Sequence, residues 1–287
     1  MPASALPAGA CDCHVHVVGD PRRYPMAADR HYTPGPAGPA DLLRHLDGLG
    51  LARAVIVQPS IYGTDNRCLL DSLEALQGVG RGVAVLDPDV TPAVLADLHA
   101  CGVRGVRINL ESAGRSDPHS IRAALAAWGR RLAPLGWHVQ VYASLDAIAA
   151  AAPALGALPV PVVLDHFAMI PAGTALADPR VQAVLGLLAS GAAYVKLSAP
   201  YRVDPSGQQA GAVAALAAAL LDSNPDRVLW ASDWPHTNRE PGKAASEVSA
   251  YRRVSGHQLA AGIAAWLPEA GLRARVLADN PARLYGF

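Results

Sequence analysis

Two histidines separated by one residue stand near the start of the chain, in the segment Cys11-Asp12-Cys13-His14-Val15-His16-Val17. The β-branched surroundings indicate a strand, in which His14 and His16 share a face. We expect Cys11 and Cys13 to continue that face below the histidines as small, partly buried groups. Two imidazoles on one strand face are compatible with a catalytic or metal-binding site, but such a pair more often reflects only packing and surface.

A second segment, more than two hundred residues later, favours the functional reading. In Val228-Leu229-Trp230-Ala231-Ser232-Asp233-Trp234-Pro235-His236 a strand ends in the carboxylate of Asp233, followed by a proline-containing turn. A first strand that carries His-x-His and a last strand that carries Asp meet only if the sheet closes on itself. The two segments together therefore predict a closed sheet with a site at one end.

Composition bounds the class of protein. The 287 residues are 51% hydrophobic, with 24 basic and 24 acidic side chains and an isoelectric point near 7.2. We expect a large core and no nucleic-acid or anionic-membrane partner. The longest apolar run, 210–221, is short against the roughly 20 residues of a membrane span. No CxxC spacing and no signal-peptide pattern are visible, so we expect a cytoplasmic protein.

Strand-like and helix-like runs alternate along the whole chain. After the first strand and an irregular loop over 19–39, strands are predicted over 54–58, 82–86, 103–110, 137–142, 160–166, 193–198 and 227–232. Helices are predicted between them over 40–49, 65–77, 91–101, 119–135, 145–155, 179–190 and 207–222, with more helix to residue 283. This pattern predicts an α/β fold, a single (β/α)8 TIM barrel that spans 1–287 as one domain. A doubly wound open sheet is the competing architecture, but Val18-Gly19-Asp20-Pro21 is not its phosphate-binding fingerprint.

Polar side chains stand at the carboxyl end of every predicted strand, where such barrels place their chemistry. They are His14 and His16, Gln58 and Ser60, Asp87, Arg107 and Asn109, Tyr142, Asp165 and His166, Lys196 and Ser198, and Ser232 and Asp233. Three histidines and an aspartate that converge at one end suit ester hydrolysis, which needs a deprotonated water and a stabilised carbonyl oxygen. Arginines there would match carboxylates on a substrate.

These segments resemble the amidohydrolase superfamily, and within it the lactonase branch that includes the pyrone-dicarboxylate hydrolases. The resemblance is carried by Asp12-Cys13-His14-Val15-His16, Asp165-His166 and Ser232-Asp233-Trp234-Pro235-His236. Further matching segments are 31–34, 58–66, 104–109 and 279–285, so it spans nearly the whole chain.

The resemblance implies a role for each matching residue. Asp233 is the general base that activates the hydrolytic water, and His14, His16 and His166 surround the scissile carbonyl. The ring and carboxylates of a lactone would be held by Tyr32, Ser60, Arg107, Tyr142 and Arg202. One departure concerns the second arginine of the pyrone-dicarboxylate hydrolases, because that position is Ala113 here. Arg115, two residues on, is a candidate to replace it.

The same four side chains, His14, His16, His166 and Asp233, could hold one zinc ion with water in the open position. A two-metal site bridged by a modified lysine is not expected, because Lys196 and Lys243 are the only lysines and neither lies at strand four or five. The relatives that carry the lactone-binding tyrosine and arginines work without metal. We therefore expect no required cofactor, with one zinc as the alternative.

The leading interpretation is a hydrolase that opens a small anionic lactone. Isomerisation of a sugar-acid lactone, zinc-dependent decarboxylation and non-catalytic binding are the alternatives, and a homo-oligomer is possible. We expect Arg104 to form a structural ion pair at the bottom of the barrel. The remaining histidines are expected to be surface or satisfied core groups; they are His31, His45, His99, His119, His138 and His257.

Overall fold

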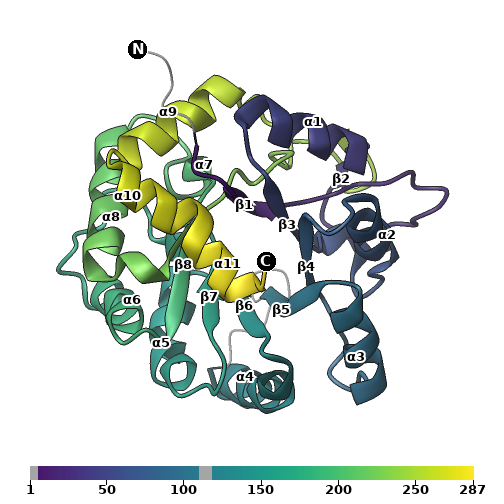
Figure 1. Ribbon diagram of the computed structural model, residues 1–287, viewed down its shortest axis with the longest axis horizontal. Coiled ribbons are helices and arrows are strands. Elements are labelled where there is room, and N and C mark those ends of the chain that lie inside the picture. The colour runs from purple at the N-terminus through teal and green to yellow at the C-terminus, as the bar shows by residue number, and fades with distance from the viewer. Residues whose placement is uncertain (1–5, 110–117) are drawn as a thin grey trace.

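Eight parallel strands form one sheet in the computed structural model, which describes residues 6–109 and 118–287. Their order is β1 (Cys11–Val15), β3 (Arg53–Val57), β4 (Gly80–Ala84), β5 (Val103–Asn109), β6 (His138–Tyr142), β7 (Val162–Leu164), β8 (Ala193–Leu197) and β9 (Val228–Trp230). Every pair of neighbours is parallel, and the helices surround the sheet (Figure 1). The predicted α/β barrel is confirmed.

The first and last strands close the barrel at the ends that carry His14 and Asp233. Val15 forms a parallel bridge with Trp234. The His16 amide donates to the Trp234 carbonyl at 2.8 Å, and the Asp233 amide donates to the His14 carbonyl at 3.0 Å. Because these backbone bonds join the two segments directly, the His-x-His pair and the aspartate are held side by side.

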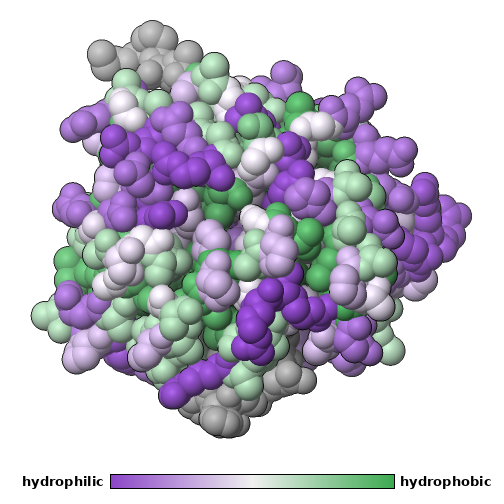
Figure 2. Space-filling view, turned by 60° about the horizontal axis from the view of Figure 1, so that its bottom comes forward, coloured by the Kyte–Doolittle hydropathy of each residue, from purple (hydrophilic) through white to green (hydrophobic). Residues whose placement is uncertain are grey.

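The helices around the barrel are α1 (Pro39–Leu49), α2 (Arg67–Ala75), α3 (Pro92–Ala100), α4 (Pro118–Leu132), α5 (Leu145–Gly156), α6 (Pro179–Ala189), α7 (Pro200–Val203), α8 (Ala210–Ser223), α9 (Gly256–Trp266), α10 (Ala270–Ala274) and α11 (Asn280–Tyr285). Several begin at a residue that satisfies a free backbone amide, as Thr91 does for Val94 and Ser144 does for Ala147. None of the helices within the described ranges is both long and apolar enough to cross a membrane. The face in Figure 2 mixes polar and apolar side chains.

The opposite end of the barrel is closed by the C-terminal helix α11, which lies across it in Figure 1. Leu284 and Tyr285 of this helix belong to the same buried cluster as Cys11 and Cys13. The end away from the site is therefore a packed core.

A shift in pairing register between Asp12 and Val15 explains why both cysteines and both histidines face the interior. Strict alternation would put Cys13 and His14 on opposite faces. In the structure Cys13 packs inside the barrel, while the Asp12 carboxylate lies 3.3 Å from His45 Nε2 of α1. The expectation that Cys11 and Cys13 continue the histidine face holds because of this irregularity.

Three expectations need correction. The loop over 19–39 contains a short strand, β2 (Thr33–Pro34), paired with β10 (Val248–Ser249). Arg104 forms no ion pair with any described residue and donates instead to the carbonyls of His99 and Val103. His138 is fully buried, yet neither of its ring nitrogens has a hydrogen-bond partner among the described residues, so it is not a satisfied core group.

Candidate active site

Four buried side chains converge at the carboxyl ends of β1, β7 and β9. The His14 and His16 Nε2 atoms are 3.3 Å apart. Asp233 Oδ1 lies 3.7 Å from His14 Nε2, 3.6 Å from His16 Nε2 and 4.0 Å from His166 Nε2. The structure thus brings the four predicted residues together around a single carboxylate oxygen.

Positive backbone φ angles turn two of these side chains toward the barrel axis. His166 (φ 48°) follows β7 directly and begins a short turn, His166–Met169, and Asp233 (φ 64°) follows β9. Residues other than glycine adopt this conformation at a cost of about 1–3 kcal/mol, and such residues cluster at functional sites. The prediction that His166 ends a strand is therefore corrected, because β7 ends at Leu164.

The two oxygens of Asp233 have different environments. Oδ2 accepts hydrogen bonds from Tyr201 Oη at 2.8 Å and from Arg202 Nε and Nη2 at 3.1 and 2.8 Å. Oδ1 is buried and has no hydrogen-bond partner among the described residues. Burial raises the pKa of Asp233, but the positive charge of Arg202 and the imidazole of His166 more than offset it, so the pKa lies well below its ordinary value. Asp233 is therefore ionised at neutral pH, and its Oδ1 is available to accept a proton.

A second buried carboxylate, Asp165, lies beneath the site. Its Oδ1 is 3.2 Å from His14 Nδ1 and 3.4 Å from Lys196 Nζ. Its Oδ2 accepts from Arg107 Nε at 3.2 Å and from Gln140 Nε2 at 3.1 Å. Burial raises the pKa of Asp165, but the positive charges of Lys196 and Arg107 and the contact with His14 more than offset it, so the pKa lies well below its ordinary value. This network fixes the ring of His14 from below.

The hydrogen bonds behind the imidazoles constrain which nitrogen carries a proton. His16 Nδ1 lies 2.7 Å from the Val57 carbonyl, which can only accept, so a neutral His16 ring is unprotonated at Nε2. His166 Nδ1 pairs with Ser198 Oγ at 2.8 Å, a hydroxyl that can donate or accept. Burial is the main cause that lowers the pKa of His14, to about 3, and that of His166 as well. Both rings are therefore neutral at pH 7.

The cluster also has the donor set for one divalent ion. The nitrogens of His14 and His16 and an oxygen of Asp233 are close enough together to share a metal, as are the corresponding atoms of His14, Asp165 and His166. The carbonyl of Val57 behind His16 is the outer contact that usually orients a metal-bound imidazole. The free Oδ1 of Asp233 completes the set. These residues therefore fit a mononuclear site.

A cavity of about 270 Å³ opens above this cluster. It is lined by His16, His31, Tyr32, Pro59, Ser60, Arg107, Tyr142, Arg202, Thr237 and Arg239. All five predicted substrate-binding residues of the described part are among them. Arg202 differs from expectation because two of its donors bind Asp233. Arg115 and Ala113 lie outside the described residues.

Several functional candidates were not assigned a role from the sequence. Lys196 and Gln140 are polar residues in otherwise apolar strands, and their side chains meet at 2.8 Å inside the barrel. That break in the apolar pattern was the available signal. Tyr201 and Arg239 come from loops or short turns, where no periodicity marks them. His31, expected to be a surface or satisfied core group, is exposed and lines the cavity.

Comparison with known proteins gives consistent results. The family model described as Amidohydrolase matches residues 11–287. A 2-pyrone-4,6-dicarboxylate hydrolase of Comamonas testosteroni is 33% identical over 99% of this chain and 92% of the relative. A 4-sulfomuconolactone hydrolase of Rhizobium radiobacter is 30% identical over 98% and 91%. The crystal structure of a candidate 2-pyrone-4,6-dicarboxylic acid hydrolase from Pseudomonas putida, 33% identical, superposes with a TM-score of 0.83 over 98% of both chains.

Proposed function

The chain belongs to the amidohydrolase family, and we propose that it opens a small carboxylated lactone with a water activated by Asp233. The observation that carries this proposal is the buried Asp233 Oδ1, which has no hydrogen-bond partner among the described residues and faces three imidazoles beneath an arginine-lined cavity. A carboxylate oxygen that is buried, ionised and free is suited to take a proton from water. The named lactone hydrolases among the relatives support the same reaction.

The attacking water has two acceptors in this arrangement. Asp233 Oδ1 and His16 Nε2 are 3.6 Å apart, and His16 Nδ1 donates to the Val57 carbonyl, so Nε2 is the ring nitrogen that can accept. A water that donates one hydrogen to each directs its lone pair away from both, toward a carbonyl carbon above. We therefore assign His16 to holding the water, a role distinct from carbonyl polarisation.

The carbonyl oxygen needs donors, which His14 and His166 can supply through Nε2. His14 Nδ1 lies between Asp165 Oδ1, an acceptor at 3.2 Å, and Lys196 Nζ, a donor at 3.3 Å. We assign the tautomer in which Nδ1 accepts from Lys196 and Nε2 carries the proton. His166 reaches the same state when Ser198 donates to its Nδ1. Water addition moves a proton to Asp233 and negative charge to the former carbonyl oxygen. Collapse then breaks the ring C–O bond, and the Asp233 carboxylic acid returns its proton to the departing oxygen.

A substrate carboxylate is assigned to Arg107. Its Nε binds Asp165, while its guanidinium lies 5.3 Å from the ring centroid of Tyr142 and lines the cavity. The terminal nitrogens are therefore available for a planar anion, as a guanidinium fork requires. Tyr32 and Ser60 line the same cavity and are assigned to the lactone ring.

We propose that these groups act without a metal, because Arg202 and Tyr201 already hold Asp233 as an oriented, ionised base. If a divalent ion is bound, His14, His16, His166 and Asp233 would hold it, and it would lower the pKa of a bound water and polarise the carbonyl. Activity after treatment with a strong chelator, with and without added zinc, separates the two cases.

The test compares carboxylated lactones with their neutral methyl esters, with products identified by NMR. We expect ring-opened acids, and a kcat/KM for the acid at least about tenfold above that for its ester. Arg107→Met should remove most of that preference, and Arg44→Met, on the exposed face of α1, should not. An isomeric lactone or a decarboxylated product contradicts hydrolysis. Neutral lactones that outperform the acids contradict the role of Arg107.

A further inference from the structure

Arg239 is a cation in the cavity that has no assigned role. It follows β9 by nine residues, is exposed, and lines the same cavity as Arg107 and Arg202. Among the described residues it makes no ion pair and donates no hydrogen bond. The other two arginines each bind a buried aspartate, Asp165 or Asp233. Arg239 is thus the cavity arginine whose whole guanidinium is available to a ligand.

The backbone on both sides of Arg239 is fixed. The His236 carbonyl accepts from the Arg252 amide at 2.9 Å, and Thr237 Oγ1 accepts from Arg202 Nη2 at 3.4 Å. The Glu240 amide donates to Ser249 Oγ at 3.3 Å. The segment therefore holds Arg239 at the cavity.

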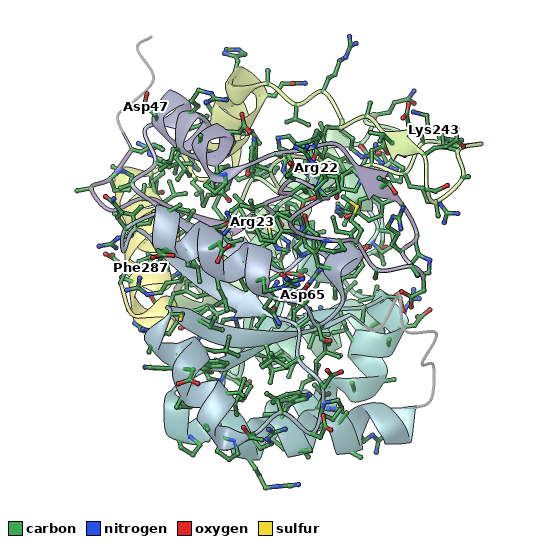
Figure 3. The ribbon with its side chains drawn as sticks, turned by 90° about the vertical axis from the view of Figure 1, so that its right-hand side faces the viewer. Arg22, Arg23, Asp47, Asp65, Lys243 and Phe287 are labelled. Carbon is green, nitrogen blue, oxygen red and sulfur yellow. The ribbon has the colours of Figure 1, made fainter. Side chains whose placement is uncertain are left out.

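The adjacent carboxylate does not neutralise Arg239. Glu240 Oε2 accepts from Lys243 Nζ at 2.5 Å and from the Ala250 amide at 2.8 Å. Figure 3 shows Lys243 at the end of the molecule opposite Phe287, which places this loop at the open end of the barrel. With its acidic neighbour already paired, Arg239 keeps its charge for the cavity.

Within residues 6–109 and 118–287, positive charge exceeds negative charge around the cavity. None of the described residues that line it is acidic. Behind its wall lie two carboxylates, Asp165 and Asp233, while Lys196, Arg107, Arg202 and Arg239 supply four cationic groups. The lowered pKa values of His14 and His166 keep both rings neutral at pH 7. The excess of about two positive charges is balanced best by a ligand with two negative charges.

The two available arginines come from strands on opposite sides of the barrel. Arg107 belongs to β5, the fourth strand of the closed sheet, and Arg239 follows β9, the eighth. Strands four places apart in an eight-stranded barrel face each other across its axis. A flat ring with an anionic group at each end could therefore reach both guanidinium groups.

We propose that Arg239 is a specificity-determining residue that binds a second anionic group, a carboxylate or sulfonate, on the lactone whose first carboxylate binds Arg107. This rests on the proposed function and narrows its substrate class to dianionic lactones. In this proposal Arg239, and not Arg115, replaces the second arginine of the pyrone-dicarboxylate hydrolases, whose position in this chain is Ala113.

Binding of ring anions that cannot be hydrolysed tests this without turnover. Calorimetric titration of benzoate, isophthalate and terephthalate should show one dicarboxylate binding at least about tenfold tighter than benzoate. Arg239→Met should abolish the tighter binding of the dicarboxylate and leave benzoate affinity within about threefold. Arg239→Lys should keep part of the tighter dicarboxylate binding, and Arg115→Met should keep all of it. No advantage in the parent, or an advantage that survives Arg239→Met, overturns the proposal.

Kinetics then separates this inference from the proposed function. With 2-pyrone-4,6-dicarboxylate and its two monocarboxylates as probes, Arg239→Met should lower kcat/KM for the diacid by about tenfold to a hundredfold. The monoacid that loses most in Arg107→Met should change by less than about threefold. Dicarboxylate binding through Arg239 without ring opening of any lactone rejects the proposed function and retains the anion site. Equal losses for diacid and monoacids reject the role of Arg239.

Discussion

Arg202 and Asp233 form an ion pair in which both guanidinium contacts, at 2.8 and 3.1 Å, reach the same oxygen, Oδ2. Tyr201 adds a third donor to that oxygen at 2.8 Å. The other oxygen, Oδ1, faces the imidazoles of His14, His16 and His166. One side of the carboxylate is thus anchored and charge-compensated, and the other side is available for chemistry.

Replacing Arg202 tests the importance of that anchor. Arg202→Met should lower kcat by at least about tenfold, because a buried carboxylate that loses its charged partner is strongly destabilised. Arg202→Lys should restore part of the rate, since it returns the charge without the two-pronged contact. Steady-state kinetics on a carboxylated lactone measures both, with Arg44→Met as control. A change confined to KM would show that Arg202 binds substrate and does not activate Asp233.

Asp233→Asn should keep the fold and lower kcat by about a hundredfold to ten-thousandfold, because an amide cannot take a proton from water. Circular dichroism and thermal unfolding check that the variant is folded. A kcat comparable with that of the parent would remove Asp233 from the role of base.

His14→Ala and His166→Ala should lower kcat more than they raise KM, since a donor to the developing oxyanion acts mainly in the transition state. Ser198→Ala, which removes the partner of His166 Nδ1, should give a smaller loss in the same parameter. Effects found in KM alone would place these imidazoles in substrate positioning.

The buried His138 at the bottom of the barrel predicts that the free energy of unfolding falls in acid. Burial, together with the nearby charge of Lys196, lowers the pKa of His138 to about 3. Between that value and the ordinary pKa of about 6.5, the unfolded chain binds a proton that the folded chain does not, so stability falls as the pH falls. From pH 7 to pH 5 this costs about 2 kcal/mol, at up to about 1.4 kcal/mol per pH unit.

Urea unfolding at several pH values measures this contribution. His138→Phe should lose less stability than the parent as the pH falls, and His257→Gln, at an exposed position, should follow the parent. Parallel curves for the parent and His138→Phe would contradict the assignment.

The barrel was predictable because buried parallel strands are nearly continuous apolar runs, and eight of them alternate with helical patterns. His14, His16 and Asp233 were predictable because polar side chains at the ends of such strands meet at one mouth. The two-residue strands β2 and β10 are too short for any periodicity. The register shift between Asp12 and Val15 likewise leaves no sequence pattern.

The contacts within the site depend on local geometry and on tertiary neighbours, which the hydrophobic pattern of the sequence does not reveal. Arg202 and Tyr201 lie in the short helix α7, which is preceded by Ala199 at positive φ, and this local geometry aims both at Asp233. Lys196 was visible as a charge in a buried strand, but its partners Asp165, His14 and Gln140 come from three other segments. Only the folded sheet brings them together.

Oxygen-isotope labelling in a single turnover tests the role of Asp233 most directly. With enzyme in excess over a carboxylated lactone in ¹⁸O-water, direct attack by an Asp233-activated water places one ¹⁸O in the new carboxylate of the product. The peptide that contains Asp233 should then remain unlabelled by mass spectrometry. Label in Asp233, or a product without ¹⁸O, would show that the carboxylate attacks the lactone itself or that no water is added, and would contradict the mechanism.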